Sequence, residues 1–218
     1  MQFADPVKNC KWAKYPLGDV TQWFGENPEL YQKYGSTKAH NGVDIVRPHG
    51  EHIFAPADGL VASTKEDPGG YGKAVRLLTR KSMKYGEWYD WAFGHLSYIH
   101  VKPGERVKKG EYIGDMGNTG FVVSNATGNG YWDANPYAGT HLHLGVRVVR
   151  EDPKGWSYGN GMPKVKVVDY RNGYKGHFDP LEMFRPIALL SSKIIRIASA
   201  VQDKVLFQFG QILRKIDM

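Results

Sequence analysis

Two short motifs about a hundred residues apart limit what this chain can fold into: His40-Asn41-Gly42-Val43-Asp44 and His141-Leu142-His143. Each motif offers side chains that suit a divalent first-row metal ion. A zinc ion that takes part in hydrolysis usually has three protein ligands and one open position for water. Together the motifs contain one histidine more than such a site needs, and a spare histidine beside a metal can move protons. The pair of motifs therefore indicates a metal-dependent hydrolase.

The spacing of the second motif fits an extended strand. Alternate residues on a strand point to opposite faces, so His141 and His143 share one face. Because residues two apart on a strand lie roughly 7 Å from each other, one histidine of the pair suits a metal ligand and the other a neighbouring base. His40 and Asp44 can converge through a turn that Gly42 permits. Two imidazoles and one carboxylate suit zinc and leave its fourth position open.

The rest of the chain predicts a mainly β fold. Glycine is abundant, with 26 of 218 residues, and recurs between short apolar runs, which favours strands joined by tight turns. We expect an antiparallel β-sheet or sandwich with long loops and one short helix over Pro28–Lys33. The loop Phe121–Ala138 is either one wall of a binding cleft or an exposed insertion. The expected strands are 53–55, 59–63, 74–79, 88–94, 112–116, 142–149 and 165–169.

The sequence divides into three segments. Residues 1–39 are predicted to form an irregular N-terminal segment that packs on the core, and residues 40–186 the metal-binding domain. After Pro186 apolar residues repeat at three- and four-residue spacing, which predicts a C-terminal amphipathic α-helix over 187–218. Packing against the domain or against a second copy is the favoured role of this helix. The alternative is binding to an anionic membrane surface.

The chain is basic, with a net charge of +7 and a pI near 9.3, and this favours anionic surroundings. Its basic residues are scattered and are not interleaved with aromatic stacking platforms, so we expect no nucleic-acid partner. Anionic wall polymers and anionic lipids fit the charge better. The N-terminus lacks the basic start and apolar stretch of a secretory signal, and no apolar run is long enough to span a membrane.

A third histidine element, Phe93-Gly94-His95-Leu96-Ser97, follows an aromatic strand. A single histidine is more often a structural residue than a metal ligand, and we assign structural roles to the remaining four. The presence of three histidine elements in one chain favours a metal centre over three separate structural histidines. The four histidines assigned to structural roles are His49, His52, His100 and His177.

From His40 to His143 the sequence resembles the lysostaphin/LytM-type zinc metallopeptidases, which hydrolyse peptide bonds of bacterial peptidoglycan. The matching pieces occur in the same order as in that family and cover about 140 residues. The family's usual link into the His141-Leu142-His143 strand is only a few residues long, whereas here it runs through 121–138. Besides the three histidine elements, the matching pieces are Ala55-Pro56-Ala57-Asp58-Gly59-Leu60-Val61, Gly70-Tyr71-Gly72-Lys73-Ala74-Val75, Val107-Lys108-Lys109-Gly110-Glu111-Tyr112-Ile113-Gly114, Gly117-Asn118-Thr119-Gly120 and Asp179-Pro180-Leu181.

The resemblance implies a role for each matching position. His141 would act as the general base, with His95 beside it, and Tyr34 sits where some family members carry a tyrosine that hydrogen-bonds the developing oxyanion. It implies a bacteriolytic enzyme or endolysin that cleaves stem-peptide or cross-bridge bonds. Such an enzyme acts in the bacterial cell wall, from the periplasm, from outside the cell or delivered by a phage. The ligands of one Zn²⁺ per chain would be His40, Asp44 and His143.

Two alternatives remain open. The chain could be a non-catalytic relative that binds the wall or activates another wall hydrolase, although such relatives usually lack one or more ligands and all are present here. The segment Pro103–Glu111 also resembles strands of biotinyl and lipoyl carrier domains. Those small β-sandwiches present a modified lysine at a hairpin tip and have no use for the two histidine motifs.

Overall fold

The computed structural model describes residues 3–33, 37–122, 137–159 and 161–184. The chain divides into two compact units, Met1–Pro180 and Leu181–Met218. The described part of the second unit holds one short helix, α2 (Leu181–Phe184). The helix predicted over 187–218 lies outside the described residues, so the three-segment division remains a prediction. Within the described ranges we find no helix with the length and apolar character needed to cross a membrane.

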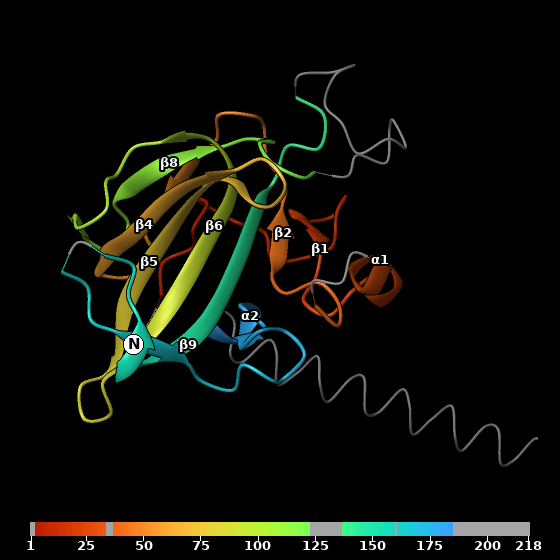
Figure 1. Cartoon of the computed structure of the whole chain (residues 1–218). Coiled ribbons are helices and arrows are strands. Elements are labelled where there is room, and N and C mark those ends of the chain that lie inside the picture. Colours follow the sequence, from red (N-terminus) through yellow and green to blue (C-terminus); the bar gives the residue numbers. More distant parts are fainter. Residues whose placement is uncertain (1–2, 34–36, 123–136, 160, 185–218) are drawn as a thin grey trace, which may run out of the picture. The chain divides into compact units, whose positions relative to one another are not determined.

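The first unit is built on an antiparallel β-sheet, which confirms the predicted fold class (Figure 1). Neighbouring strands in the main path run in the order β1-β2-β9-β6-β5-β4-β7. These strands are β1 (Val20–Gln22), β2 (Val43–Ile45), β4 (Gly59–Asp67), β5 (Gly72–Ser82), β6 (Glu87–Ile99), β7 (Arg106–Val107) and β9 (Leu142–Trp156). Off this path are β3 (His52–Phe54), β8 (Tyr112–Met116), β10 (Val165–Val167) and β11 (His177–Phe178).

Strand β9 organises the sheet because both of its edges are paired. One edge pairs with β6, from the Gly94–His143 pair to the Glu87–Arg150 pair. The other edge pairs in turn with β2, β11 and β10, which come from distant parts of the chain. Strand β9 therefore holds together segments from the start and the end of the described chain.

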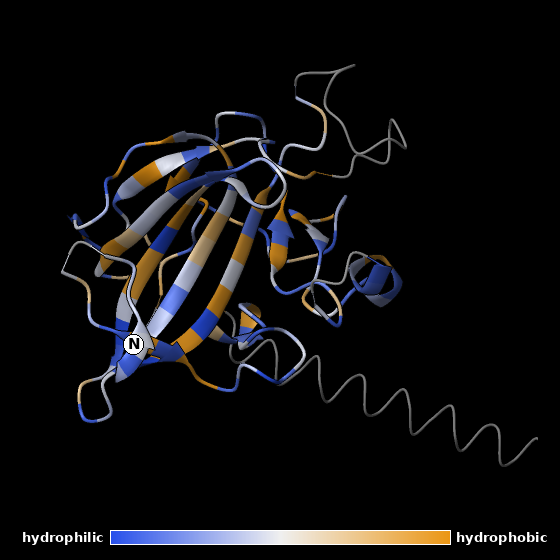
Figure 2. Ribbon diagram, viewed as in Figure 1, coloured by the Kyte–Doolittle hydropathy of each residue, from blue (hydrophilic) through white to orange (hydrophobic). Residues whose placement is uncertain are grey.

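The alternation of residues on β6 and β9 separates an apolar core from a polar face (Figure 2). Leu144 lies opposite Phe93 and Val146 opposite Trp91, and all four side chains are fully buried. The buried Trp91 indole donates a hydrogen bond to Thr79 Oγ1 at 2.9 Å, so its polar atom is satisfied inside the core. The residues between these positions point to the opposite face, where the histidine motif lies.

Several elements differ from the sequence prediction. Strand β6 does not end at Gly94 but runs on through His95 to Ile99, and His95 takes a positive φ of 63° within it. The segment 1–39 is not wholly irregular, because it contains β1 and the expected helix α1 (Pro28–Lys33). Strands of two or three residues such as β1, β2, β7 and β11 carry too few residues for a periodic pattern to reveal them.

Candidate metal centre

The register of β2 against β9 brings the two sequence motifs together. Asp44 on β2 lies directly opposite His143 on β9 in the antiparallel ladder. His40 lies four residues before Asp44, just ahead of β2, and its main-chain N–H donates to Glu26 O. The three side chains are buried and form the only group among the described residues whose geometry could hold a metal ion.

Three atoms from these side chains form a nearly equilateral triangle. His143 Nδ1 lies 3.0 Å from both His40 Nε2 and Asp44 Oδ1, and the third side, His40 Nε2 to Asp44 Oδ1, is 3.1 Å. Nitrogen and oxygen ligands of Zn²⁺ lie about 2.0–2.2 Å from the ion, and three atoms about 3 Å apart can all meet that distance at once. The donor set and its spacing therefore fit a three-ligand zinc site with an open position.

The ring orientation of His40 also fits a ligand. Its Nδ1–H donates to the carbonyl oxygen of Trp23 at 3.0 Å. The lone pair of a neutral His40 is thereby placed on Nε2, which is the atom that faces Asp44 and His143. A carbonyl behind a histidine ring is the usual device that fixes the tautomer of a metal ligand.

His143 faces the centre through its other nitrogen. Its Nδ1 belongs to the triangle, whereas its Nε2 is buried without a hydrogen-bond partner among the described residues. Gly42 covers that nitrogen: a Cβ added to Gly42 would lie 2.7 Å from His143 Nε2 and 2.6 Å from Leu144 O. Strand β2 can approach β9 this closely only because position 42 has no side chain.

We predict that Gly42→Ala weakens zinc binding about 10–100-fold, the usual effect of disturbing the surroundings of a ligand. Overpacking should also cost about 1–3 kcal/mol of unfolding free energy. Zinc content after dialysis and the thermal unfolding midpoint measure the two effects. Gly69→Ala is the matched control, because its added Cβ meets only Asp67 Oδ1 at 3.8 Å. A Gly42→Ala protein with normal zinc content and unfolding midpoint would contradict this account.

Charges at the triangle favour a cation. Burial alone would raise the pKa of Asp44, but His40 and His141 and the hydrogen bonds from His143 and His40 bring that pKa well below its ordinary value. Burial would likewise lower the pKa of His40, and the nearby Asp44 carboxylate raises it. The carboxylate is thus ionised and favours a positive charge beside it, which is what a metal cation held by the three side chains would supply.

Two further histidines lie beside the triangle with their orientations fixed. His141 Nδ1–H donates to Gly139 O at 2.7 Å, and His95 Nδ1–H donates to Thr119 O at 2.8 Å. His141 Nε2 lies 3.8 Å from Asp44 Oδ2, and the centroids of the His95 and His141 rings are 4.6 Å apart. Burial, and then the neighbouring His141 and His143, lower the pKa of His95 to about 3. His95 is therefore neutral near pH 7.

An aromatic residue that sequence reasoning assigned no role supports the centre. The ring of Tyr71 stacks on His143, with centroids 4.8 Å apart and an interplanar angle of 25°. Its hydroxyl is held by Asn41, whose Nδ2 donates to it at 3.0 Å. Gly94 makes room for this stack, because a Cβ there would lie 3.2 Å from the Tyr71 ring. Asn41 and Tyr71 both lie inside matched motifs, but nothing in the sequence alone pairs them.

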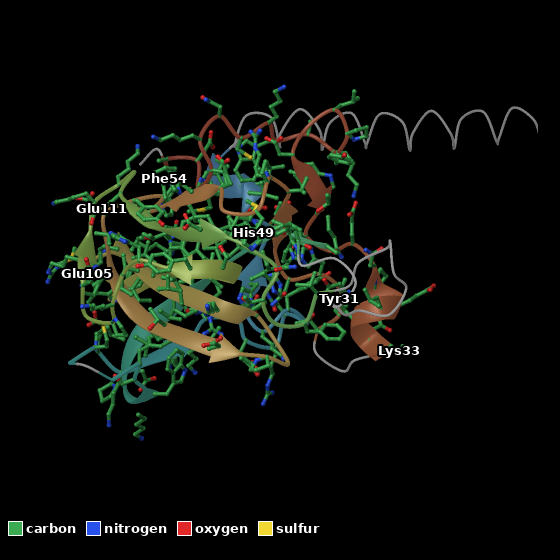
Figure 3. All side chains as sticks on the ribbon, turned by 90° about the horizontal axis from the view of Figure 1, so that it is seen from above. Tyr31, Lys33, His49, Phe54, Glu105 and Glu111 are labelled. Carbon is green, nitrogen blue, oxygen red and sulfur yellow. The ribbon has the colours of Figure 1, made fainter. Side chains whose placement is uncertain are left out.

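Tyr34, the predicted oxyanion residue, lies outside the described residues. Another tyrosine, Tyr31 of α1, has its ring centroid 5.4 Å from that of His40, and Figure 3 shows it on the side of the helix that faces the strands. Burial and then the Asp44 carboxylate raise its pKa, so the Tyr31 phenol stays protonated and can donate a hydrogen bond. Most of the loop 121–138 also lies outside the described residues.

The four histidines expected to be structural are not members of the triangle. His177 is buried and donates from Nδ1 to Tyr174 O at 2.8 Å, and the exposed His52 pairs with Asp115 at 2.7 Å. The His49 ring lies 4.8 Å from that of Tyr137, and the His100 ring packs near aromatic neighbours.

Comparison with known proteins identifies a family. The profile described as Peptidase family M23 matches residues 38–157. An uncharacterized metalloprotease of Haemophilus influenzae is 38% identical over 113 residues, which cover 50% of this chain and 22% of that protein. The peptidoglycan DD-endopeptidase ShyA of Vibrio cholerae is 36% identical over 114 residues, covering 52% of this chain and 21% of that protein.

More distant matches include a protein with a different stated role. The murein hydrolase activator NlpD of Escherichia coli is 30% identical over 115 residues, covering 53% of this chain and 26% of that protein. Among solved structures, a zinc containing peptidase from Vibrio cholerae aligns with a TM-score of 0.48 at 26% identity, over 68% of this chain and 37% of that chain. This chain thus spans 21–26% of the length of the three curated relatives.

Proposed function

The chain belongs to peptidase family M23, and from this premise we propose that it is a zinc-dependent endopeptidase that hydrolyses peptide bonds in bacterial peptidoglycan. The observation that carries the proposal is the triangle of His40 Nε2, Asp44 Oδ1 and His143 Nδ1, with sides of 3.0–3.1 Å. Two more histidines, His95 and His141, lie beside it with Nδ1 occupied. This arrangement supports three ligands and an adjacent proton-transfer pair.

The proposed mechanism assigns the proton transfers to His141. When bound, Zn²⁺ supplies a Lewis acid that polarises the scissile carbonyl and lowers the pKa of water to about 7. His141 accepts the proton of the attacking water at Nε2 and returns it to the leaving amine, a role that contributes about 10²–10⁴-fold to the rate. The Gly139 carbonyl accepts a hydrogen bond from His141 Nδ1–H. This bond orients the ring and stabilises the imidazolium that exists between the two proton transfers.

The residues next to His141 complete the site. His95 is neutral and carries its lone pair on Nε2, so it can orient the water or accept a hydrogen bond from it. Donors that stabilise the developing oxyanion are worth about 3–4 kcal/mol each. Tyr31, whose phenol lies near His40, is the described residue that best fits this part, and Tyr34 remains the prediction from the resemblance.

The proposal is tested by digesting purified peptidoglycan and identifying the released peptides by mass spectrometry. We expect new amino termini from one type of peptide bond. Activity should disappear when a chelator removes the metal and return when stoichiometric Zn²⁺ is added. Cleavage of glycosidic bonds, or full activity in a protein shown to be free of metal, would refute the proposal.

A second candidate function is a wall-binding or activating protein without peptidase activity. One relative is named a murein hydrolase activator, and this observation favours the alternative. In this case the purified chain would release no peptides from peptidoglycan and would accelerate release by another hydrolase. The complete set of His40, Asp44 and His143 argues for the catalytic role.

We place the proposed activity in the bacterial cell wall, in the periplasm or outside the cell. A narrower proposal is that a phage delivers the chain to the wall as an endolysin with bacteriolytic activity. The net charge of +7 supports contact with anionic wall polymers.

Self-association or membrane-surface binding through residues 187–218 also remains a proposal. Sedimentation with and without anionic vesicles tests it.

A further inference from the structure

A cluster of charged side chains lies farther along the sheet face that carries the metal-site histidines. Arg147 is four residues beyond His143 on β9, so alternation places both side chains on the same face. Asp90 of β6 lies directly opposite Arg147, and Arg76 of neighbouring β5 reaches the same carboxylate. The two positions on β9 are roughly 13 Å apart, about the length of four residues of extended peptide.

One oxygen of Asp90 receives three hydrogen bonds. Its Oδ2 accepts from Arg76 Nη2 at 2.5 Å, Arg147 Nε at 2.8 Å and the Tyr158 hydroxyl at 2.6 Å. We call Arg76, Asp90, Arg147 and Tyr158 the arginine cluster. Asp90 is fully buried, so this contact fixes both guanidinium groups in place.

The arginine cluster has an excess positive charge. Two guanidinium groups face one carboxylate, and Asp90 is the only carboxylate bonded to either arginine among the described residues. Burial and then the charge of Asp90 keep the Tyr158 phenol neutral, with its pKa raised. His177, which lies over Gly145 between the cluster and His143, is neutral because burial, and then Arg76, lower its pKa to about 3.

Both arginines also keep N–H donors outside their bonds to Asp90, and neither side chain is fully buried. A guanidinium group carries five N–H donors. Arg76 bonds Asp90 through Nη2, and Arg147 uses Nε for Asp90 and Nη2 for the Tyr158 hydroxyl, at 3.4 Å. The two arginine side chains are 13% and 15% exposed, and the exposed Trp156 ring lies 5.7 Å from the Arg147 guanidinium carbon. A partly buried cation with free donors is costly to leave uncompensated.

We propose that Arg76 and Arg147 form a subsite that binds a free carboxylate of the peptide substrate. A carboxylate matches the planar donor fork of arginine, and it neutralises the excess charge of the arginine cluster. The distance along β9 places this carboxylate a few residues from the scissile bond. The inference rests on the proposed peptidase function and specifies its substrate class: stem peptides with a free carboxylate rather than a carboxamide at that position.

The test uses the zinc-loaded 218-residue chain and a panel of synthetic cross-linked stem-peptide dimers. Each free carboxylate of the dimer is amidated in turn, and kcat and KM are measured for every member. A charged hydrogen bond typically contributes enough to change binding about 10–100-fold. We therefore expect one amidated dimer to lose at least about tenfold in kcat/KM, mainly through a higher KM.

Variants assign the effect to the arginine cluster. Arg147→Gln should bring the ratio of kcat/KM between the carboxylate dimer and the amidated dimer close to one, by raising KM for the carboxylate dimer. Asp90 keeps its contacts with Arg76 and Tyr158 in this variant. Arg80→Gln is the matched control: Arg80 pairs with Glu151 at 3.0 Å and stacks on Trp88, and its loss should keep the preference.

Two results would overturn the inference while the proposed function stands. One is equal cleavage of all dimers by the unmodified protein, a result that does not depend on any variant folding. The other is an unchanged preference in a folded Arg147→Gln protein. If the proposed peptidase function is wrong, the protein cleaves no member of the panel. That result would refute the inference together with the proposed function.

Discussion

Asp44→Ala is expected to abolish both stoichiometric zinc binding and peptidase activity. Asp44 supplies the one negative charge of the triangle and lies within 3.1 Å of His40 Nε2 and His143 Nδ1, the two nitrogens proposed as ligands. Without Asp44, only two imidazoles would hold the cation. The affinity for zinc should then fall by more than about 100-fold, because mutating groups around a ligand already lowers metal affinity about 10–100-fold. Elemental analysis after dialysis and mass spectrometry of digested peptidoglycan measure the two losses.

The control for Asp44→Ala is Asp58→Ala. Asp58 is an exposed carboxylate that accepts a hydrogen bond from the main chain of Lys109 and lies outside the triangle. We expect this control to keep its zinc and its activity. An inactive Asp44→Ala protein that retained one zinc ion per chain would show that Asp44 is not a ligand.

His141→Ala is expected to keep one zinc per chain and to lower kcat about 10²–10⁴-fold, the contribution of a general base. His141 lies beside the triangle rather than in it: its Nε2 is 3.8 Å from Asp44 Oδ2. Its ring is held by Gly139 O and not by a ligand residue, so its removal should leave the three ligand atoms in place. Zinc content and kcat measured on the same preparation separate the two effects.

His52→Ala is the matched control for His141→Ala, because His52 is an exposed histidine on β3 that pairs with Asp115. It should change neither zinc content nor kcat. Loss of zinc from His141→Ala would make His141 a ligand. If His141→Ala instead retained most of its activity, His95, the other oriented histidine at the site, would be assigned as the general base.

The sequence predicts the parts of the site that depend on local spacing. The strand beginning at Leu142 places His141 and His143 on one side of β9, and the glycine at position 42 allows β2 to come close. The antiparallel fold class follows from the same short apolar runs and turn residues. These features are set within a few residues of each other, which is the range over which propensity and periodicity operate.

Other contacts at the site depend on tertiary structure and could not be predicted. The carbonyl behind His40 belongs to Trp23, and the ring stacked on His143 belongs to Tyr71. Strand β6 continues through His95, which has a positive φ, to Ile99, whereas the sequence predicts that it ends at Gly94. The two contacts join residues that lie far apart in the sequence, so local spacing gives no sign of them.

The contact between Trp23 and His40 has a practical consequence for making shortened versions of the protein. The segment shared with the family starts at residue 38, after β1 and after Trp23. A fragment cut at that boundary would lose the carbonyl that holds the His40 ring, which could then present either nitrogen. It would also end before His177 and the strand that carries it. Truncation for expression or crystallisation should therefore begin ahead of β1 and extend past β11.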